Sequence, residues 1–499
     1  MKPMMKHLFR ILSAAFLFAA FLSCNKQAEQ PQLTEGVVAV SRVTIDGKYA
    51  SLNRESSSFL ATLPTTTDFS ALKVSIDTDA QEILIDNQAV DGEKIVLDLS
   101  SPKTVRLIQD GRIYQDYTLE VRNTGLPVVR IETPNRKSIT SKEVWMEGAT
   151  LRIEKADGTV DYEGPMSVRG RGNSTWNYPK KPYAIKLDSK AEILSMPSHK
   201  RWVLLANWKD RTILRNDAAF WLSSHTGLPY TVRGQYVELV LNGLHMGNYY
   251  LCEQIKINKN RVNVKDGGLL LELDTYFDEV NRFHSKLFNL PWMVKEPDEE
   301  ELTREQFQEF QQWIADLETL LKDQSRVKAH EYEQYLDVDT AIDYLIAEEL
   351  TGNHDFYNTW PSNGPHSAYL YKQPGGKLYT GPMWDYDYHT FVPDRTKQWA
   401  GAKQTMYYPA LLKDEKFRAR LLERWDAQKD VLKGLPEYID QMADHIRLSE
   451  YYNHSLWPIN PPQTENGDEQ LSFQQAVERM KKAFLDKWEW MDKNIGNLR

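Results

Sequence analysis

The hydrophobic and polar positions along the chain divide it into a β-rich first part and a helical last part. Between residues 36 and 123, short β-branched runs such as Val37–Ile45 and Asp116–Val121 partly alternate with polar residues and are separated by turns. Strands at this spacing predict a small β-sandwich of the immunoglobulin-like kind over residues 36–123. A boundary is expected at Asn-Thr-Gly-Leu-Pro, residues 123–127, and strand patterns resume after it as far as Asp274.

Two hairpins are predicted from local turn signals. In the first, Gln235–Leu241 and Met246–Ile257 are separated by a segment that begins with Asn-Gly at 242–243, a pair that favours a tight two-residue turn. In the second, Ala368–Tyr371 and Lys377–Thr380 flank the sequence Gln-Pro-Gly-Gly. The second hairpin is expected to lie inside the helical half of the chain.

Apolar residues take up helical spacing from Glu301 onward. Asp339 is expected to cap one helix that runs to Leu350, and residues 405–499 are expected to be mostly helical. The preceding helix has an apolar stripe formed by Phe307, Phe310, Ile314, Leu317 and Leu321. This order of elements predicts an α+β protein in which a kinase-like bilobal domain, residues 126–499, has a β-rich lobe followed by a helical lobe.

The first residues of the chain have the pattern of a targeting segment. Basic residues precede an apolar run at 11–22, and the small Ser23 is followed by Cys24. The run is short for a membrane span, and the pattern resembles a bacterial lipoprotein signal peptide over residues 1–23. Lipidation of Cys24 would then anchor the protein in the cell envelope, on the periplasmic or outer-membrane surface, through a polar tether at 24–35. A plain secretory signal with an incidental cysteine is the alternative.

Composition narrows the classes of function. With 499 residues, 41% hydrophobic and 26% charged, the chain is long enough for a large core and more than one domain. Its net charge of −9 and the lack of a long basic block argue against nucleic-acid binding. The 14 Trp and 25 Tyr residues fit either a groove for a sugar or polymer or packing in cores and loops.

A glycine-rich segment, Arg-Gly-Arg-Gly-Asn-Ser-Thr-Trp at 169–176, is the first candidate for chemistry. Glycines let backbone N–H groups approach phosphates, although an ordinary strand connection is the alternative. Lys186, on the strand that follows, is the predicted phosphate lysine, with Lys180 and Lys181 as nearby alternatives. The nucleotide-binding residues predicted within the segment are Arg171, Gly172 and Asn173.

Acidic residues in apolar strands form a second group of candidates. Glu253 lies in one such strand, and Glu272 and Asp274 lie in another. A carboxylate in such a strand must be paired, hydrogen-bonded or functional. These carboxylates, with Glu253 as the predicted nucleotide-binding residue, are therefore expected either to contact a nucleotide or orient a lysine, or to form a structural pair with Lys256 or an arginine such as Arg215.

The richest segment for chemistry lies between residues 352 and 391. Asp355 is the predicted general base, placed to accept a hydroxyl proton. Asp385 and Asp387 alternate along an extended segment, which would direct both carboxylates to one side. Together with Asn358 they are the predicted ligands of Mg²⁺ or Mn²⁺. A carboxylate loop, a hairpin and a metal-binding carboxylate follow one another in the same order in protein kinases.

Five motifs together resemble the CotH kinase family, atypical protein kinases related to a spore coat protein. They are RGRGNSTWNYPKKPYAIKLD, WKDRTILRN, NGLHMGNYYLCEQI, NHDFYN and PMWDYDYHTF, and the resemblance covers roughly residues 126–400. It implies a kinase-like fold and transfer of the γ-phosphoryl group of ATP, with Mg²⁺ or Mn²⁺, to Ser or Thr of secreted proteins. By motif it assigns Asp355 as the catalytic aspartate and Asp385 as a metal ligand. It also matches Lys186 to the nucleotide lysine and Tyr379 to an aromatic residue that packs on adenine.

The predicted function is therefore that of a cell-envelope lipoprotein with an atypical Ser/Thr kinase domain, acting on an unidentified protein substrate. Two other functions fit parts of the sequence. A non-catalytic surface lipoprotein could bind a polymer or protein on a kinase-like scaffold. A glycoside hydrolase could use two carboxylates, but that function leaves the glycine-rich segment and its lysine unexplained.

Overall fold

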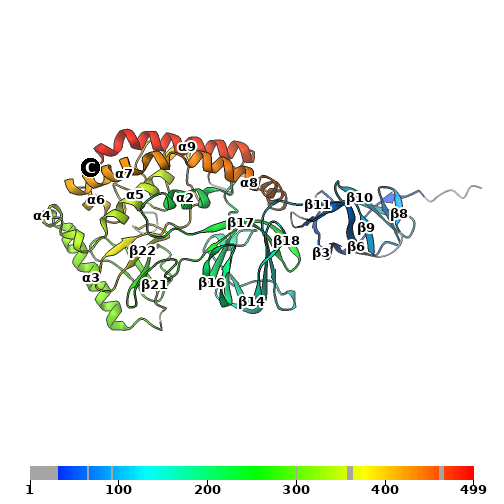
Figure 1. The fold of residues 1–499 in the computed structure, drawn as a ribbon, viewed down its shortest axis with the longest axis horizontal. Coiled ribbons are helices and arrows are strands. Elements are labelled where there is room, and N and C mark those ends of the chain that lie inside the picture. The colour runs from blue at the N-terminus through cyan, green and yellow to red at the C-terminus, as the bar shows by residue number, and fades with distance from the viewer. Residues whose placement is uncertain are drawn as a thin grey trace, which may run out of the picture. The chain divides into compact units, whose positions relative to one another are not determined.

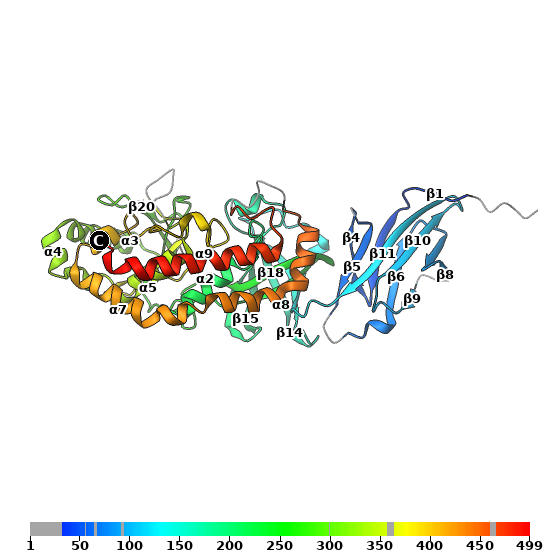
Figure 2. The same ribbon diagram turned by 90° about the horizontal axis from the view of Figure 1, so that it is seen from above.

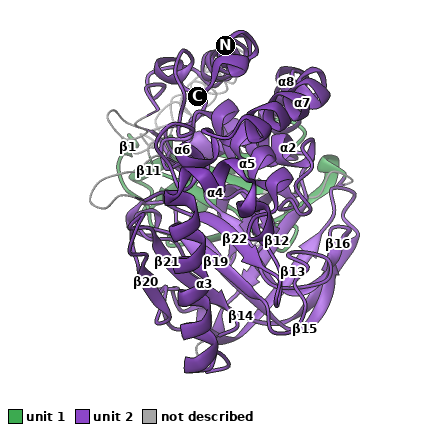
Figure 3. Ribbon diagram, turned by 90° about the vertical axis from the view of Figure 1, so that its left-hand side faces the viewer, with its two compact units in different colours: residues 1–61, 68–121 green, residues 62–67, 122–499 purple. Residues whose placement is uncertain are grey.

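The computed structural model describes residues 32–499 except 55, 64–66, 91–93, 299, 357–363 and 460–465. The chain divides into two compact units (Figure 3). One is formed by residues 1–61 and 68–121, and the other by residues 62–67 and 122–499. The architecture is mixed, with sheets first and helices towards the C-terminus, so the predicted α+β class is confirmed (Figure 1). Among the described residues, none of the helices has both the length and the apolar character of a membrane span.

The first unit contains two antiparallel-rich sheets. In one sheet the strand order is β4-β5-β11-β10-β7-β8, with β1 paired to β11, and in the other it is β3-β2-β6-β9. The strands are β1 (Thr34–Glu35), β2 (Val40–Ile45), β3 (Lys48–Tyr49), β4 (Ser51–Asn53), β5 (Ser58–Thr62), β6 (Leu72–Thr78), β7 (Glu82–Ile85), β8 (Gln88–Val90), β9 (Lys94–Leu97), β10 (Lys103–Gln109) and β11 (Ile113–Arg122). Alternating residues of β6 and β10, such as Val74 and Leu107, are buried, which is the pattern of strands with one face turned inward.

The second unit begins with a closed barrel of strand order β12-β13-β14-β15-β16-β18-β17. Its interior is filled by fully buried side chains such as Ile131, Leu151 and Trp202. The strands are β12 (Val128–Glu132), β13 (Met146–Glu154), β14 (Val160–Gly170), β15 (Tyr183–Ile193), β16 (Met196–Leu205), β17 (Gly234–Leu241) and β18 (Leu244–Glu253). The predicted hairpin of β17 and β18 is confirmed, and both Asn242 and Gly243 have the positive φ angles, 51° and 80°, that its tight turn requires.

A smaller sheet of order β20-β21-β19-β22-β23 follows the barrel. Its strands are β19 (Leu269–Leu273), β20 (Arg282–His284), β21 (Pro291–Glu296), β22 (Ala368–Lys372) and β23 (Leu378–Thr380). Strands β22 and β23 are the second predicted hairpin, which is confirmed. Because β22 pairs with β19, the sheet joins the segment before the helices to the hairpin within them.

Helices make up most of the remaining chain. They are α2 (Arg215–Ser224), α3 (Arg304–Lys322), α4 (Gln324–Lys328), α5 (Val338–Thr351), α6 (Tyr408–Leu411), α7 (Glu415–Leu432), α8 (Leu435–Leu456) and α9 (Phe473–Asn494). Helices α8 and α9 pack side by side along this unit (Figures 1 and 2). The predicted Asp339 cap is wrong, because Asp337 accepts the N-terminal hydrogen bond of α5 from Thr340 N while Asp339 pairs with Arg420.

Candidate active site

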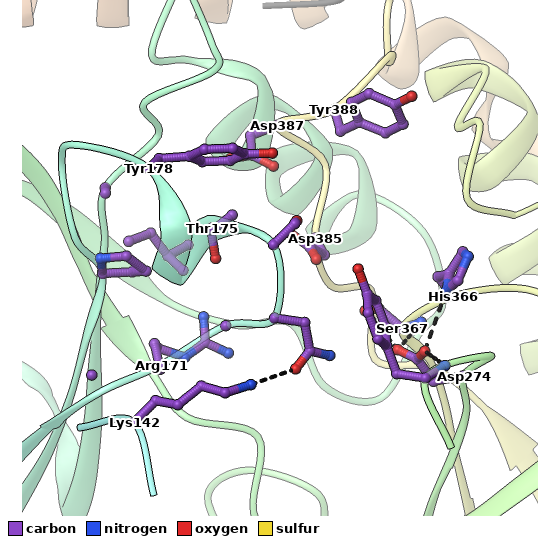
Figure 4. A pocket seen from close by; sticks show the side chains of 18 of the residues that line it. Lys142, Arg171, Thr175, Tyr178, Asp274, His366, Ser367, Asp385, Asp387 and Tyr388 are labelled. Atoms are coloured by element: carbon purple, nitrogen blue, oxygen red, sulfur yellow. Dashed lines mark hydrogen bonds and ion pairs between the residues drawn. The ribbon is translucent and has the colours of Figure 1, made fainter. Parts of the chain in front are cut away.

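A cavity of about 700 Å³ lies in the second unit between the glycine-rich turn and the predicted acidic residues. Its lining comes from the turn after β14, the loop after β16, the ends of β19 and β21, and the segments that contain Asp355 and Asp385. Figure 4 shows the turn with Arg171 and Thr175 on one side and the segment with Asp385 and Asp387 on the other. Residues far apart in the sequence thus meet around one space.

The glycine-rich turn is shaped by close packing. Gly172 has a φ of 82°, and a Cβ atom there would lie 1.9 Å from Thr175 Oγ1, so a side chain does not fit. Lys142 Nζ donates to Asn173 Oδ1 at 3.0 Å, and the Arg171 guanidinium lies 5.1 Å from the centre of the Trp384 ring. The turn therefore presents cationic side chains to the cavity, next to the residue that precedes Asp385.

Helix α5 positions both acidic segments. The buried Glu348 accepts hydrogen bonds from Asn353 Nδ2 at 3.0 Å and from the Tyr386 hydroxyl at 2.6 Å. Asn353 Oδ1 in turn accepts from the backbone N–H of Asp355 at 3.0 Å. Glu348 thus ties the Asp355 loop and the Asp385–Asp387 segment to one rigid helix.

The carboxylates of the cavity are in an unfavourable electrostatic environment. Burial raises the pKa of Asp355 to about 7, and the charge on Asp385 adds to the effect. Burial and Asp385 together raise the pKa of Asp387 to about 8. Asp385 is exposed to the solvent of the cavity, yet the protein packed around it also raises the pKa of its carboxyl group. A cation at this end of the cavity would relieve the repulsion among these charges.

Backbone strain accompanies this acidic end. Asp385 has a φ of 71° and Ser367 a φ of 52°, both in the left-handed region that is unfavourable for residues other than glycine. Strained residues of this kind are concentrated at functional sites, where the surrounding fold must hold them. Their presence on the wall of one cavity agrees with a site at this position.

The structure adds residues that the sequence predictions did not assign as site residues. Asp274, directly after β19, accepts hydrogen bonds from His366 Nδ1 at 3.2 Å and from the backbone N–H of Ser367 at 3.1 Å, as drawn in Figure 4. Burial alone would lower the pKa of His366, but Asp274, Asp355 and Asp385 raise it overall. The signal for Asp274 was its place, with Glu272, in an otherwise apolar strand segment.

Lys295 of β21 is the second addition. Its ammonium group lies 3.0 Å from Glu272 Oε2 and also pairs with Glu279 at the cavity wall. Two flanking carboxylates outweigh the effect of burial and raise the pKa of Lys295 well above its usual value. Burial dominates at Glu272 and raises its pKa to about 7. Lys295 is therefore a charged lysine oriented by a glutamate at the cavity wall. Lys186 was the lysine predicted to contact the phosphates.

The predicted residues divide into those that line the cavity and those that do not. Lys186 is exposed on β15 and lies outside the lining. Glu253 is fully buried and pairs with Arg233 and Arg261, so it has a structural pair, although with different partners from those expected. Tyr379 stacks on Tyr371 with ring centres 5.0 Å apart and also lies outside the lining. Those that line the cavity are Arg171, Gly172, Asn173, Asp355, Asp385 and Asp387.

Two further predictions, for Asn358 as a metal ligand and for Cys24 as the lipidated residue, fall outside the described residues. Lys180 lines the cavity, but its ammonium group donates to the backbone carbonyls of Ala206 and Asn248. Two of its N–H groups are therefore used within the protein. The other lysine and arginine residues of the lining are Lys142, Arg169, Arg171, Lys209 and Lys295.

The donor set at the acidic end fits a hard divalent cation. Asp385 and Asp387 provide carboxylate oxygens, the ligands that Mg²⁺ and Mn²⁺ prefer. In the part of the chain that the structure describes, no three His, Cys, Asp or Glu side chains converge closely enough to hold an ion by themselves.

Comparisons with known proteins give one strong match. The family model described as CotH kinase protein matches residues 168–491. None of the curated proteins matches the chain. One solved structure that matches is a protein of Bacteroides thetaiotaomicron, provisionally named a glycoside hydrolase, at 16% identity over 36% of this chain and 53% of that chain. This chain thus spans about half the length of that protein, and the TM-score of 0.15 is too low to establish a shared fold.

Proposed function

The chain belongs to the CotH kinase family, whose model matches residues 168–491, and from this premise we propose that it transfers the γ-phosphoryl group of ATP to a Ser or Thr hydroxyl of a secreted or surface protein. The observation that supports this most is the shared cavity. It brings three aspartates to one side of a glycine-rich turn with cationic side chains. Neither a sugar-cleaving pair of carboxylates nor a passive scaffold explains that combination.

Asp385 and Asp387 are the residues that would hold the divalent cation, Mg²⁺ or Mn²⁺. Such an ion neutralises charge on the phosphates during transfer. Both carboxylates have raised pKa values in its absence, so they would release protons on binding it. The strained backbone at Asp385 is consistent with a side chain fixed in advance for this purpose.

Asp355 is the proposed general base. It must accept the proton of the attacking hydroxyl and orient that hydroxyl towards the phosphorus atom. A pKa of about 7 suits a group that gains and loses a proton near neutral pH. The Asp355 backbone N–H donates to Asn353, and Asn353 donates to Glu348, so the loop that carries Asp355 is fixed to α5.

Cationic side chains on the opposite wall are the proposed phosphate contacts. Lys295 takes the part expected for Lys186, since Glu272 orients it at the cavity wall. Arg171 belongs to the glycine-rich turn, and Lys142 comes from the segment before β13 and donates to Asn173 of that turn. The barrel then corresponds to the β-rich lobe of a kinase-like bilobal domain, and α3 to α9 correspond to the helical lobe.

The first unit and the N-terminal segment complete the proposal. Residues 36–123 form an immunoglobulin-like β-sandwich that acts as a spacer, and residues 126–499 form the transfer domain. Cys24 carries the lipid that attaches the protein to the membrane of the cell envelope.

Two substitutions separate binding from transfer. Asp385→Ala should abolish metal-dependent binding of ATP, because the cation would lose a protein ligand and could no longer attach the phosphates to the site. Asp355→Ala should keep ATP binding but reduce transfer on the order of 10²-fold or more, the usual loss for a general base. ATP affinity is measured by titration calorimetry, and transfer by label from γ-labelled ATP into casein as a generic acceptor.

Asp316→Ala, at an exposed position of α3, is the matched control and should change neither quantity. If Asp385→Ala binds ATP and Mg²⁺ as well as the unmodified protein does, the proposed metal site is wrong. A protein that binds no nucleotide with any divalent cation would instead favour the non-catalytic scaffold.

A further inference from the structure

A second cavity, of about 760 Å³, lies beside the smaller sheet. It shares no lining residue with the first cavity. Its walls are the loop before β19, the segment after β21, the first turns of α3 and the turn between β22 and β23. The Gln373 side chain holds two of these walls together, because it accepts from Lys265 N at 3.1 Å and donates to Asn263 O at 2.9 Å. This cavity, the acidic groove, is therefore formed by several elements that the Gln373 side chain helps to hold together.

The floor of the acidic groove is apolar. Val264, Leu269, Leu302 and Phe310 are each less than 9% exposed there, and the partly buried Trp313 adds an aromatic surface. A floor of this kind favours an apolar side chain of a ligand over a hydrated ion. The size of the groove likewise fits a segment of several residues better than a single ion.

Its rim is strongly acidic. Asp266, Asp298, Glu301 and Glu309 are all exposed, and within the described residues none of them forms an ion pair. The fifth acidic residue of the groove, Glu296, is already paired with Lys256.

Few cations balance this rim. Lys372 lies 4.8 Å from the centre of the Trp313 ring, and its ammonium group donates to the backbone carbonyl of Gln373. Lys265 is the other basic residue of the lining. The rim therefore has an excess of negative charge that a ligand could complement.

We propose that the acidic groove binds a segment of a partner protein in which lysines or arginines flank one aromatic or aliphatic residue. The basic residues would pair with the four acidic residues of the rim, and the apolar residue would rest on Phe310 and Trp313. This surface recognises its partner independently of the phosphoryl-transfer cavity, so its occupation does not require ATP.

The test uses the whole protein and a short fluorescein-labelled peptide in which lysines flank one phenylalanine. We expect fluorescence anisotropy to give a Kd on the order of 10 μM at low salt, weaker at higher salt because exposed charges are screened. A peptide with serine in place of phenylalanine should bind about tenfold more weakly, as one buried side chain is worth about that much. A peptide with glutamates in place of lysines should not bind.

Two charge-reversal variants provide the matched comparison. Glu309→Lys replaces attraction by repulsion at the groove and should weaken peptide binding about fivefold to tenfold. Asp430→Lys makes the same charge change at an exposed position of another helix, α7, outside the groove and should alter the Kd less than about twofold. Thermal unfolding followed by tryptophan fluorescence checks that both variants remain folded.

The proposal is overturned if the lysine peptide does not bind, or if both variants weaken binding equally. Equal affinity for the phenylalanine and serine peptides would show that the groove recognises only the charges of the peptide. It would overturn the proposed role of the apolar floor. A protein dimer that Glu309→Lys dissociates, without binding of the peptide, would show that a second copy of this chain occupies the groove instead.

Discussion

Arg215 offers the sharpest test of how the candidate site is held in place. Its side chain is 1% exposed and pairs with Asp210 and with Asp468, at 2.7 Å to Asp468 Oδ2, and both of these side chains are fully buried. Its Nε also donates at 3.0 Å to the carbonyl of Thr390, in the segment that follows Asp387. One guanidinium thus joins helix α2, the segment that contains Asp468 and the acidic segment of the cavity.

We predict that Arg215→Met lowers the free energy of unfolding of the second unit by about 3–5 kcal/mol at pH 7. Removing one partner of a buried ion pair has this effect because it leaves carboxylates buried without a cation. The several hundred residues of this unit give an unfolding entropy of about 2.1 cal/mol/K per residue, so the midpoint should fall by about 4–6 °C.

The assay follows tryptophan fluorescence during heating and urea titration. All 14 tryptophans lie at or after Trp145, within the second unit, so the signal reports on that unit alone. Arg420→Met is the matched control, because Arg420 and Asp339 form a bidentate pair that is 35% and 44% exposed. An exposed pair contributes about 1 kcal/mol or less. Equal losses for the two variants would show that the buried ion pairs of Arg215 contribute no more than an exposed pair.

Three further predictions concern other parts of the chain. Burial lowers the pKa of Lys180 to about 7, so between about pH 7 and pH 10 the unfolded chain holds a proton that the folded protein lacks. The free energy of unfolding in urea, relative to that of Lys180→Met, should therefore rise with pH by up to about 1.4 kcal/mol per pH unit. A difference between the two proteins that stays constant with pH would contradict this. Cys24→Ser should release the protein from the membrane fraction, and unchanged partition would rule out a lipid anchor at Cys24. A protein that begins at Leu126 should fold and keep ATP binding; insolubility would show that the boundary is misplaced.

The parts of the fold that could be predicted from the sequence are those with local signals. The hairpin of β17 and β18 was predictable because Asn242 and Gly243 accept positive φ angles. Barrel closure was not, because it depends on β12 pairing in parallel with β17, with Val128 opposite Glu238. Nothing near either strand in the sequence indicates that partner.

The same contrast applies to the candidate site. Asp355, Asp385 and Asp387 could be predicted because they lie in short motifs on either side of one hairpin, and the structure places all three at the cavity. Lys186 was favoured by its closeness in sequence to the glycine-rich turn, but the exposed face of β15 carries it away from the cavity. Lys295 lies on β21, and only the pairing of β21 with β19 brings it to Glu272.

Titration calorimetry of the unmodified protein would show whether the acidic cavity binds ATP through a divalent cation. We expect ATP to bind with Mg²⁺ or Mn²⁺ and binding to be lost when the cation is removed with EDTA. Lys295→Met should weaken the same binding, whereas Lys186→Met should leave it unchanged. Binding of ATP that is equally tight without any divalent cation, or no binding with either metal, would show that the proposed site is wrong.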